Sequence, residues 1–317
     1  FRRVLFRSIN SGTINVGANA LTIAPAWANN GSVQISGGVL AGGTVTNSPG
    51  KSFSGFGTIS NSIVNLGTLT ATGGVLTLVN GPTGNGTVVV LNVFNVLPAW
   101  TNTGMVTNAG TIVGGTLTNA GTLNGAGFIN PAVVNQGRVD FGGTISNNFA
   151  QSAGSFTLSG NATITGNATV SGGALDLTGN KLTNALLVVD GTGALTNAVA
   201  GGTVYGAFSN ASVVSVTADT YFNGAVTNTG ALFYRGAISN VLANAGSLTL
   251  NNAATISTLL NTGTVNLNGQ TLTNGAFVNA GTLTNAVAGA TVNGSVSNAA
   301  TINVTAPHFC GLITTMA

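Results

Sequence analysis

The side chains that could do acid–base or metal chemistry are few in this sequence. The four acidic residues are all aspartates, and they lie in the middle of the chain: Asp140, Asp176, Asp190 and Asp219. A glycoside hydrolase needs two carboxyl groups in one groove, and a calcium site needs several oxygen ligands. The aspartates could do this chemistry only if the fold brings them together.

Two pairs of charged or acidic residues are close enough in sequence to interact. Arg138 and Asp140 lie two residues apart, so on a strand their side chains share a face. This pair could be catalytic, but we favour a solvated ion pair, which contributes little to stability. Asp176 and Asp190 could approach each other, although “VDGTG” from Val189 is typical of an Asp-Gly turn. We therefore predict no catalytic residue and no enzymatic activity.

The only histidine, His308, and the only cysteine, Cys310, lie together near the end of the chain. They could bind a metal or form a nucleophilic pair, but two residues make neither a metal site nor a catalytic triad. A single cysteine also excludes an internal disulfide and a cysteine-based zinc site. We predict no metal and no cofactor.

Aromatic and amide side chains offer two possible binding or modification sites. Thr220–Phe222 and Leu232–Tyr234, with Arg235, could form a patch on which sugars stack; alternation within a buried strand is the simpler interpretation. Asn161 and Asn167 each begin an Asn-x-Thr triplet, the acceptor of N-glycosylation in eukaryotes. Such triplets are expected by chance in a chain so rich in Asn and Thr.

Recurrent threonines beside the apolar positions offer a third possible surface. A flat, regular array of them could bind ice, but the irregular steps between them and the frequent Ser, Asn and Ala replacements argue against it. The threonines in question are Thr13, Thr44, Thr58, Thr68, Thr111, Thr122, Thr264 and Thr282.

The composition indicates a folded, almost uncharged chain. Hydrophobic residues make up 44% of the 317 residues and charged residues 3%, which is the opposite of a disordered composition. The most apolar stretch, Thr87–Trp100, is interrupted by Asn92, Asn95 and Pro98, so no membrane-spanning helix is predicted. Three of the seven basic residues lie within residues 1–8, and the remaining four match the four aspartates. A nucleic acid partner is therefore disfavoured.

A short repeat dominates the sequence. Asn-x-Gly-x-apolar begins at Asn10, Asn29, Asn65, Asn102, Asn108, Asn119, Asn135, Asn228, Asn244, Asn261 and Asn279. Successive starts late in the chain are 16 to 19 residues apart, and self-similarity at a fixed period is the signature of a solenoid. Motifs such as Thr282–Thr284 alternate polar and apolar residues, as strands with one buried face do. Asn and Gly tolerate positive φ, so we expect them to form the corners.

These features predict an all-β fold, a single-stranded parallel β-helix with 16 to 19 residues per coil. Stacking would place each Leu or Val over its equivalent in the next coil. Equivalent Asn side chains would form hydrogen-bonded ladders. We favour the right-handed form; the six-residue steps of “NATITGNATVSGG” from Asn161 keep a left-handed hexapeptide helix open.

A longer repeat lies over the short one. Leu195–Ala218 matches Leu283–Ala306 at 16 of 24 positions, which indicates an internal duplication covering about 135–218 and 228–306. We predict one continuous solenoid over residues 9–306. Residues 1–8 and 307–317 depart from the pattern.

Runs such as “NAGTIVGGTLTNAGTLNGAG”, from Asn108, resemble the passenger domains of bacterial autotransporters and filamentous-haemagglutinin-like adhesins. The resemblance extends over about Ile9 to Ala306. It implies a secreted or surface-displayed rod that holds binding loops away from the cell. The secretion domain and translocator barrel of such proteins are not among these residues, so we expect a fragment.

The first eight residues, “FRRVLFRS”, resemble the translation of a sequencing adapter. On that interpretation the segment is an artefact and the net charge of +3 has no meaning; the alternative is a basic arm for an anionic membrane or a nucleic acid.

The leading functional hypothesis is a structural, non-catalytic segment of a bacterial adhesin, located outside the cell or on its surface. Its partner would be a host, glycan or cell-surface ligand, and the chain could also associate with itself end to end or laterally. The alternatives are a fragment of a β-helical polysaccharide-degrading enzyme, or an ice- or glycan-binding solenoid.

Overall fold

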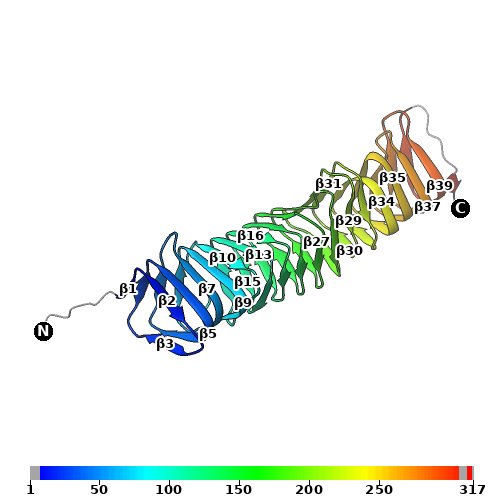
Figure 1. Cartoon of the computed structure of the whole chain (residues 1–317). Coiled ribbons are helices and arrows are strands. Elements are labelled where there is room, and N and C mark those ends of the chain that lie inside the picture. Colours follow the sequence, from blue (N-terminus) through cyan, green and yellow to red (C-terminus); the bar gives the residue numbers. More distant parts are fainter. Residues whose placement is uncertain (1–7, 307–312, 316–317) are drawn as a thin grey trace. The chain divides into compact units, whose positions relative to one another are not determined.

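The computed structural model describes residues 8–306 and 313–315, and the regular elements among them are all β-strands (Figure 1). The chain divides into two units, Phe1–Asn148 and Phe149–Ala317. Within each unit, strands pair in parallel with the equivalent strands of neighbouring coils. The predicted all-β parallel solenoid is therefore confirmed, while its right-handedness stays a prediction. Residues 1–7, His308 and Cys310 lie outside the described residues.

The coils of the N-terminal unit contribute strands to three faces, which we call the ladder, second and third faces in chain order. The ladder face contains β1 (Ser8–Asn10), β4 (Trp27–Asn29), β6 (Val45–Asn47), β8 (Ile63–Asn65), β12 (Trp100–Asn102), β15 (Leu117–Asn119) and β18 (Val133–Asn135). The second face contains β2 (Thr13–Val16), the first parts of β5 (Ser32–Gly42), β7 (Ser52–Ile59) and β9 (Thr68–Leu78), then β10 (Thr87–Val90), β13 (Met105–Asn108), β16 (Thr122–Gly125) and β19 (Arg138–Phe141). The third face contains β3 (Ala20–Ile23), the later parts of β5, β7 and β9, then β11 (Val93–Val96), β14 (Thr111–Gly114), β17 (Phe128–Ile129) and β20 (Thr144–Ile145).

The C-terminal unit has the same three faces. Four long strands bend from one face to another: β34 (Ala231–Asn244), β35 (Ser247–Asn261), β37 (Thr271–Asn279) and β39 (Thr291–Asn298). The ladder face also contains β21 (Phe149–Gln151), β24 (Ala168–Val170), β27 (Leu186–Val189), β30 (Ala207–Asn210), β33 (Val226–Asn228) and β41 (Ile313–Thr315). The second face contains β22 (Ser155–Leu158), β25 (Ala174–Asp176), β28 (Ala194–Asn197), β31 (Val213–Val216), β36 (Thr264–Asn266), β38 (Thr282–Asn285) and β40 (Thr301–Val304). The third face contains β23 (Ala162–Ile164), β26 (Lys181–Asn184), β29 (Gly202–Val204) and β32 (Thr220–Phe222).

Two positions bear on the predicted boundaries of the repeat. Ser8, assigned from sequence to the off-pattern start, begins β1 and pairs with Trp27. Ile313–Thr315, within the off-pattern tail, forms β41 and pairs with β39.

Coil length varies more than the sequence pattern indicates. Many coils take between 16 residues, as from Leu117 to Val133, and 19, as from Ser8 to Trp27. The coil from Leu182 to Val204 takes 22. Part of the excess is the turn Asp190–Gly193, closed by a 2.8 Å hydrogen bond from Gly193 N to Asp190 O. The Asp-Gly turn predicted there is thus confirmed.

The two copies of the duplicated stretch form the same corner. In Leu177–Asn180 and in Leu267–Gln270 the fourth N–H donates to the first carbonyl oxygen at 2.8 Å. Both central residues of each turn have positive φ, 47° and 77° in the first and 51° and 75° in the second, as in type I′ turns. The glycine N–H of each turn donates to Oδ1 of an asparagine one coil later, Asn197 at 3.0 Å and Asn285 at 2.9 Å. The shared corner therefore depends on an asparagine in the following coil.

Columns of apolar side chains fill the interior, as the repeat predicts. On the second face of the N-terminal unit one column contains Val33, Phe53, Leu69, Val88, Val106, Leu123 and Val139, successive members being direct register partners. In the C-terminal unit Leu232, Leu248, Val265 and Leu283 stack in the same way. All of these side chains are buried, and each contributes about 1.5–3 kcal/mol by leaving water.

The motif asparagines form ladders inside the solenoid, confirming the second prediction. In each pair the side-chain Nδ2 donates to Oδ1 of the asparagine one coil later, at distances such as 2.7 Å from Asn102 to Asn119 and 2.9 Å from Asn119 to Asn135. One ladder contains Asn10, Asn29, Asn47 and Asn65, and another contains Asn210, Asn228, Asn244, Asn261, Asn279 and Asn298. Each amide thus satisfies its neighbours while binding consecutive coils together.

The glycine of the Asn-x-Gly motif has a different role from the one predicted. None of the motif glycines has a positive φ, so the expectation that the motif needs left-handed backbone was wrong. A Cβ on Gly121 would overlap the carbonyl oxygen of Gly104, and one on Gly137 would overlap that of Gly121. Glycine is required because the corners of consecutive coils touch backbone to backbone.

Gly121→Ala should destabilise the protein by about 1–3 kcal/mol, because the new methyl group forces two coils apart. Gly12→Ala is the matched control: it changes a glycine of the same motif, yet no atom lies within 4 Å of the added Cβ, so its effect should stay within about 0.5 kcal/mol. Urea unfolding of the full chain, followed by circular dichroism, measures both. Equal effects of the two substitutions would contradict the steric explanation.

Asn119→Ala should lower stability by about 2–3 kcal/mol, because it removes buried hydrogen bonds and leaves their partners unpaired. Asn119 accepts from Asn102 and donates to Asn135 and to Arg138 O, the last at 2.9 Å. Asn124→Ala, on the outer side of β16, should change stability by less than about 0.5 kcal/mol. The same unfolding experiment compares them, and a harmless Asn119→Ala would argue against a stabilising ladder.

Candidate functional site

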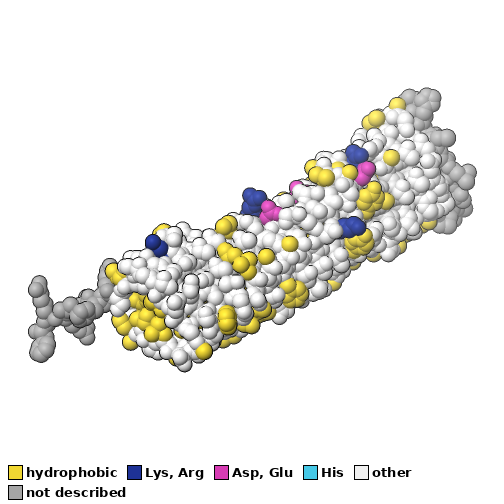
Figure 2. Space-filling model, in the orientation of Figure 1, with side chains coloured by type: hydrophobic (Ala, Val, Ile, Leu, Met, Phe, Trp, Pro, Cys, Tyr) yellow, Lys and Arg dark blue, Asp and Glu magenta, His cyan; other side chains and the backbone are white. Residues whose placement is uncertain are grey.

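Charged side chains are isolated on the face of the molecule shown in Figure 2. Arg138 Nη2 lies 3.4 Å from Asp140 Oδ2, and the two side chains are 64% and 31% exposed. They share the outer side of β19, as their spacing predicts. This is the solvated ion pair favoured from the sequence, and solvent screening makes it weak.

Asp176 and Asp190 do not form the pair considered from sequence. Asp176 lies on β25, where its register partner one coil later is Thr196, and its Oδ1 accepts from Thr178 N at 3.1 Å. Asp190 follows β27, a strand of a different face. The extra corner residues of these long coils displace the two aspartates onto different faces, so this possible catalytic pair is excluded.

A second ion pair was missed from the sequence. Arg235 Nε donates to Asp219 Oδ1 at 2.8 Å, and Arg235 Nη1 donates to Thr217 O at 3.3 Å. The two residues are 16 positions apart, which is one coil in this part of the chain. That spacing, applied to the charged residues as well as to the asparagines, would have identified the pair.

The aromatic segments alternate between the core and the surface. Phe222 and Tyr234 are buried, whereas Tyr221 and Phe233 are 39% and 37% exposed. Phe222 stacks on Phe208 with ring centroids 4.7 Å apart and an angle of 3°. Tyr221 lies on the third face and Phe233 on the second, so they form no single aromatic row.

Tyr234 is the one described side chain with a clearly perturbed pKa. Its hydroxyl donates to Thr220 O at 2.8 Å inside the core. Burial, and then the charges of Tyr221 and Asp219, raise its pKa well above the ordinary value of about 10. Tyr234 is therefore a neutral structural hydroxyl at physiological pH.

The threonines considered for ice binding do not form one array. Thr13, Thr68 and Thr122 belong to one outer column of the second face, but Met105 and Arg138 also belong to it. The remaining members lie elsewhere: Thr58 and Thr111 on the third face, Thr44 at a corner, and Thr264 beside Thr282 in the C-terminal unit. Of the two predicted glycosylation triplets, both asparagines are exposed, and Asn161 Oδ1 accepts from Lys181 N at 3.0 Å.

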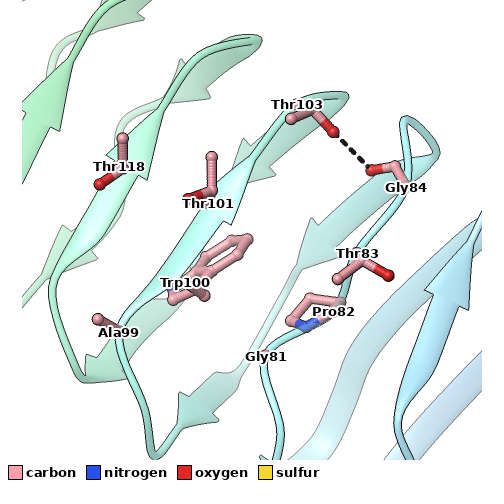
Figure 3. Close-up of a pocket in the computed structure, with 9 residues that line it drawn as sticks. All are labelled: Gly81, Pro82, Thr83, Gly84, Ala99, Trp100, Thr101, Thr103 and Thr118. Carbon is pink, nitrogen blue, oxygen red and sulfur yellow. Dashed lines mark hydrogen bonds between the residues drawn. The ribbon is translucent and has the colours of Figure 1, made fainter.

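A hollow of about 360 Å³ lies on the ladder face beside β12 (Figure 3). It exists because the coil before β12 forms no regular strand here: the segment 81–84, which includes Pro82, makes only an isolated bridge between Thr83 and Val64. The indole ring of Trp100 lies between this segment and β12 (Figure 3). Thr83, Thr101, Thr103 and Thr118 also line the hollow.

A second hollow, of about 420 Å³, lies at the equivalent place beside β4. The sequence Pro-Ala-Trp-x-Asn-x-Gly-x-Val begins at both Pro25 and Pro98, and each copy places its tryptophan in a hollow. Ile9 and Ala28 line the hollow of Trp27, at the positions that Thr83 and Thr101 take beside Trp100. This repeat of the Pro-Ala-Trp motif was missed from the sequence, although it is visible there.

Two searches of the described residues, 8–306 and 313–315, bear on other functions. They contain no group of three or more His, Cys, Asp or Glu side chains placed to hold a metal ion. Nor does this part of the chain contain a helix long and apolar enough to cross a membrane.

Comparison with known proteins adds no relative to this description. No family model matches the chain, and neither a curated protein nor a solved structure matches it significantly.

Tyr234→Phe should reverse its effect on stability as pH rises. Below about pH 10 the wild type should be more stable by about 1 kcal/mol, because it keeps the hydrogen bond to Thr220 O. Above pH 10 the unfolded tyrosine ionises while the buried one does not, so the wild type loses this advantage progressively. Urea unfolding between pH 8 and about pH 11 measures the difference.

Tyr205→Phe is the control for that experiment. Tyr205 is 45% exposed, so its substitution should leave the pH dependence of stability unchanged. A constant difference between wild type and Tyr234→Phe across the whole range would contradict the effect assigned to burial.

Proposed function

We propose that this chain is a structural, non-catalytic segment of a secreted or surface-displayed bacterial adhesin. The observation that carries the proposal is the use made of the repeat. Its asparagines form the ladders, its glycines form the coil-to-coil contacts, and its apolar residues form the core columns. The residues that recur are thus those that extend a stack of coils.

The outer surface supports the same role. Its recurrent side chains are neutral, mostly Thr, Ser and Asn, which can stack on themselves in consecutive coils without repulsion. The backbone of an inner coil is hydrogen-bonded to coils on both sides, which resists local opening and proteolysis. Such a segment is suited to hold binding residues away from a cell, and its ligand would be a host or cell-surface molecule such as a glycan. Association with a second copy, through the ends or sides of the stacks, is compatible with this role.

Surface labelling of bacteria that carry the gene tests this proposal. Antibodies raised against the purified chain should label intact cells, and brief treatment of those cells with an external protease should remove the label. A cytoplasmic protein probed in parallel should be detected only after permeabilisation. Labelling that requires permeabilisation would contradict the proposal.

A further inference from the structure

The hollow beside Trp100 interrupts an otherwise regular face. The four-stranded sheet β1–β4–β6–β8 ends at β8, and β12 pairs with β15 on its far side. Between β8 and β12 the chain passes through Pro82, which has no N–H to donate to a neighbouring strand. The opening is therefore set by the local sequence, and its volume is in the range of small-molecule sites.

The lining of the hollow is neutral and rich in hydroxyl groups. Thr101 and Thr118 are register partners on adjacent coils, and their hydroxyls make no hydrogen bond within the described residues. Thr103 Oγ1 donates to Gly84 O at 2.9 Å (Figure 3) and keeps its acceptor sites. The lining includes no charged side chain. A ligand with several neutral hydroxyl groups matches this set of donors and acceptors.

Trp100 supplies the apolar part of the site and an unused donor. The residue is only 5% exposed, and its Nε1 is buried without a hydrogen-bond partner. A buried indole N–H ordinarily has a partner. Its ring and Pro82 provide flat apolar surface, against which the C–H face of a sugar ring can pack.

We propose that the Trp100 hollow binds one pyranose ring of a neutral glycan. The ring's hydroxyl groups would bond to Thr101 and Thr118, and its C–H face would pack on the indole. The inference names a ligand class for the adhesin proposed above and rests on that function for its biological role.

The Trp27 hollow is an internal comparison. It has the same Pro-Ala-Trp corner and an indole Nε1 without a partner, but Ile9 and Ala28 replace two of the threonine positions. We expect it to bind the same sugars more weakly.

Intrinsic fluorescence tests the proposal, because the chain contains only two tryptophans. In Trp27→Phe the emission reports on Trp100 alone, and neutral hexoses and their oligosaccharides should change it saturably at millimolar concentrations. Glucuronate at the same concentrations should have little effect. Thr101→Val and Thr118→Val should each weaken binding at least tenfold, whereas Thr107→Val, on the second face, should not.

Calorimetric titration of the wild-type chain repeats the measurement without altering either tryptophan. Absence of saturable binding in both experiments, or equal binding of glucuronate, would overturn the proposal. Binding that survives Thr101→Val and Thr118→Val would overturn it too, as would stronger binding at Trp27, measured in Trp100→Phe. These results are independent of surface labelling, so a displayed chain without this sugar site and a sugar-binding chain that is not displayed are distinguished.

Discussion

Close contact between consecutive parallel coils is the constraint on which the rest of this structure depends. Neighbouring strands in a sheet lie about 4.8 Å apart, so every residue has its own equivalent from the next coil as a close neighbour. At the corners this separation leaves no room for a Cβ, and Gly121 sits directly against the backbone of Gly104. Inside, it is the distance across which one asparagine amide reaches the next, as from Asn102 to Asn119 at 2.7 Å. The Asn-x-Gly motif is the chemical expression of that single spacing.

The same constraint explains the neutral composition. A charge repeated in every coil would face its own kind along a column, whereas hydroxyl and amide groups can donate and accept along it. Charges survive where an opposite partner is within reach, along a strand for Arg138 with Asp140 and across one coil for Arg235 with Asp219. Departures from regular stacking are correspondingly local: where the coil before β12 forms no strand, a hollow opens beside Trp100.

Sequence reasoning was sufficient for whatever repeats and insufficient for whatever interrupts the repeat. The parallel coils, the apolar columns and the asparagine ladders follow from the period, because each position is tested again in every coil. The role of the motif glycine was misjudged, since a turn and a close backbone contact select the same residue. The placement of Asp176 relative to Asp190 could not be obtained without knowing that the intervening corners are longer. The hollow of Trp100 depends on Pro82 in the coil before it, a relation between residues that no regular period links.

The asparagine ladders have a direction, because each Nδ2 donates toward the next coil and each Oδ1 accepts from the coil before. The first member has no donor before it; Asn10, Asn102 and Asn210 instead accept from an N–H two residues on, at 3.1–3.2 Å. Asn108, Asn184 and Asn274, each of which donates to a backbone oxygen of the next coil, leave a buried Oδ1 without a partner. The penalty of beginning a ladder is thus incurred once, however many members follow, as in the nucleation of a helix. Adding a coil to an existing ladder is consequently more favourable than starting another, which makes duplication of whole coils an accessible route by which such a chain can grow.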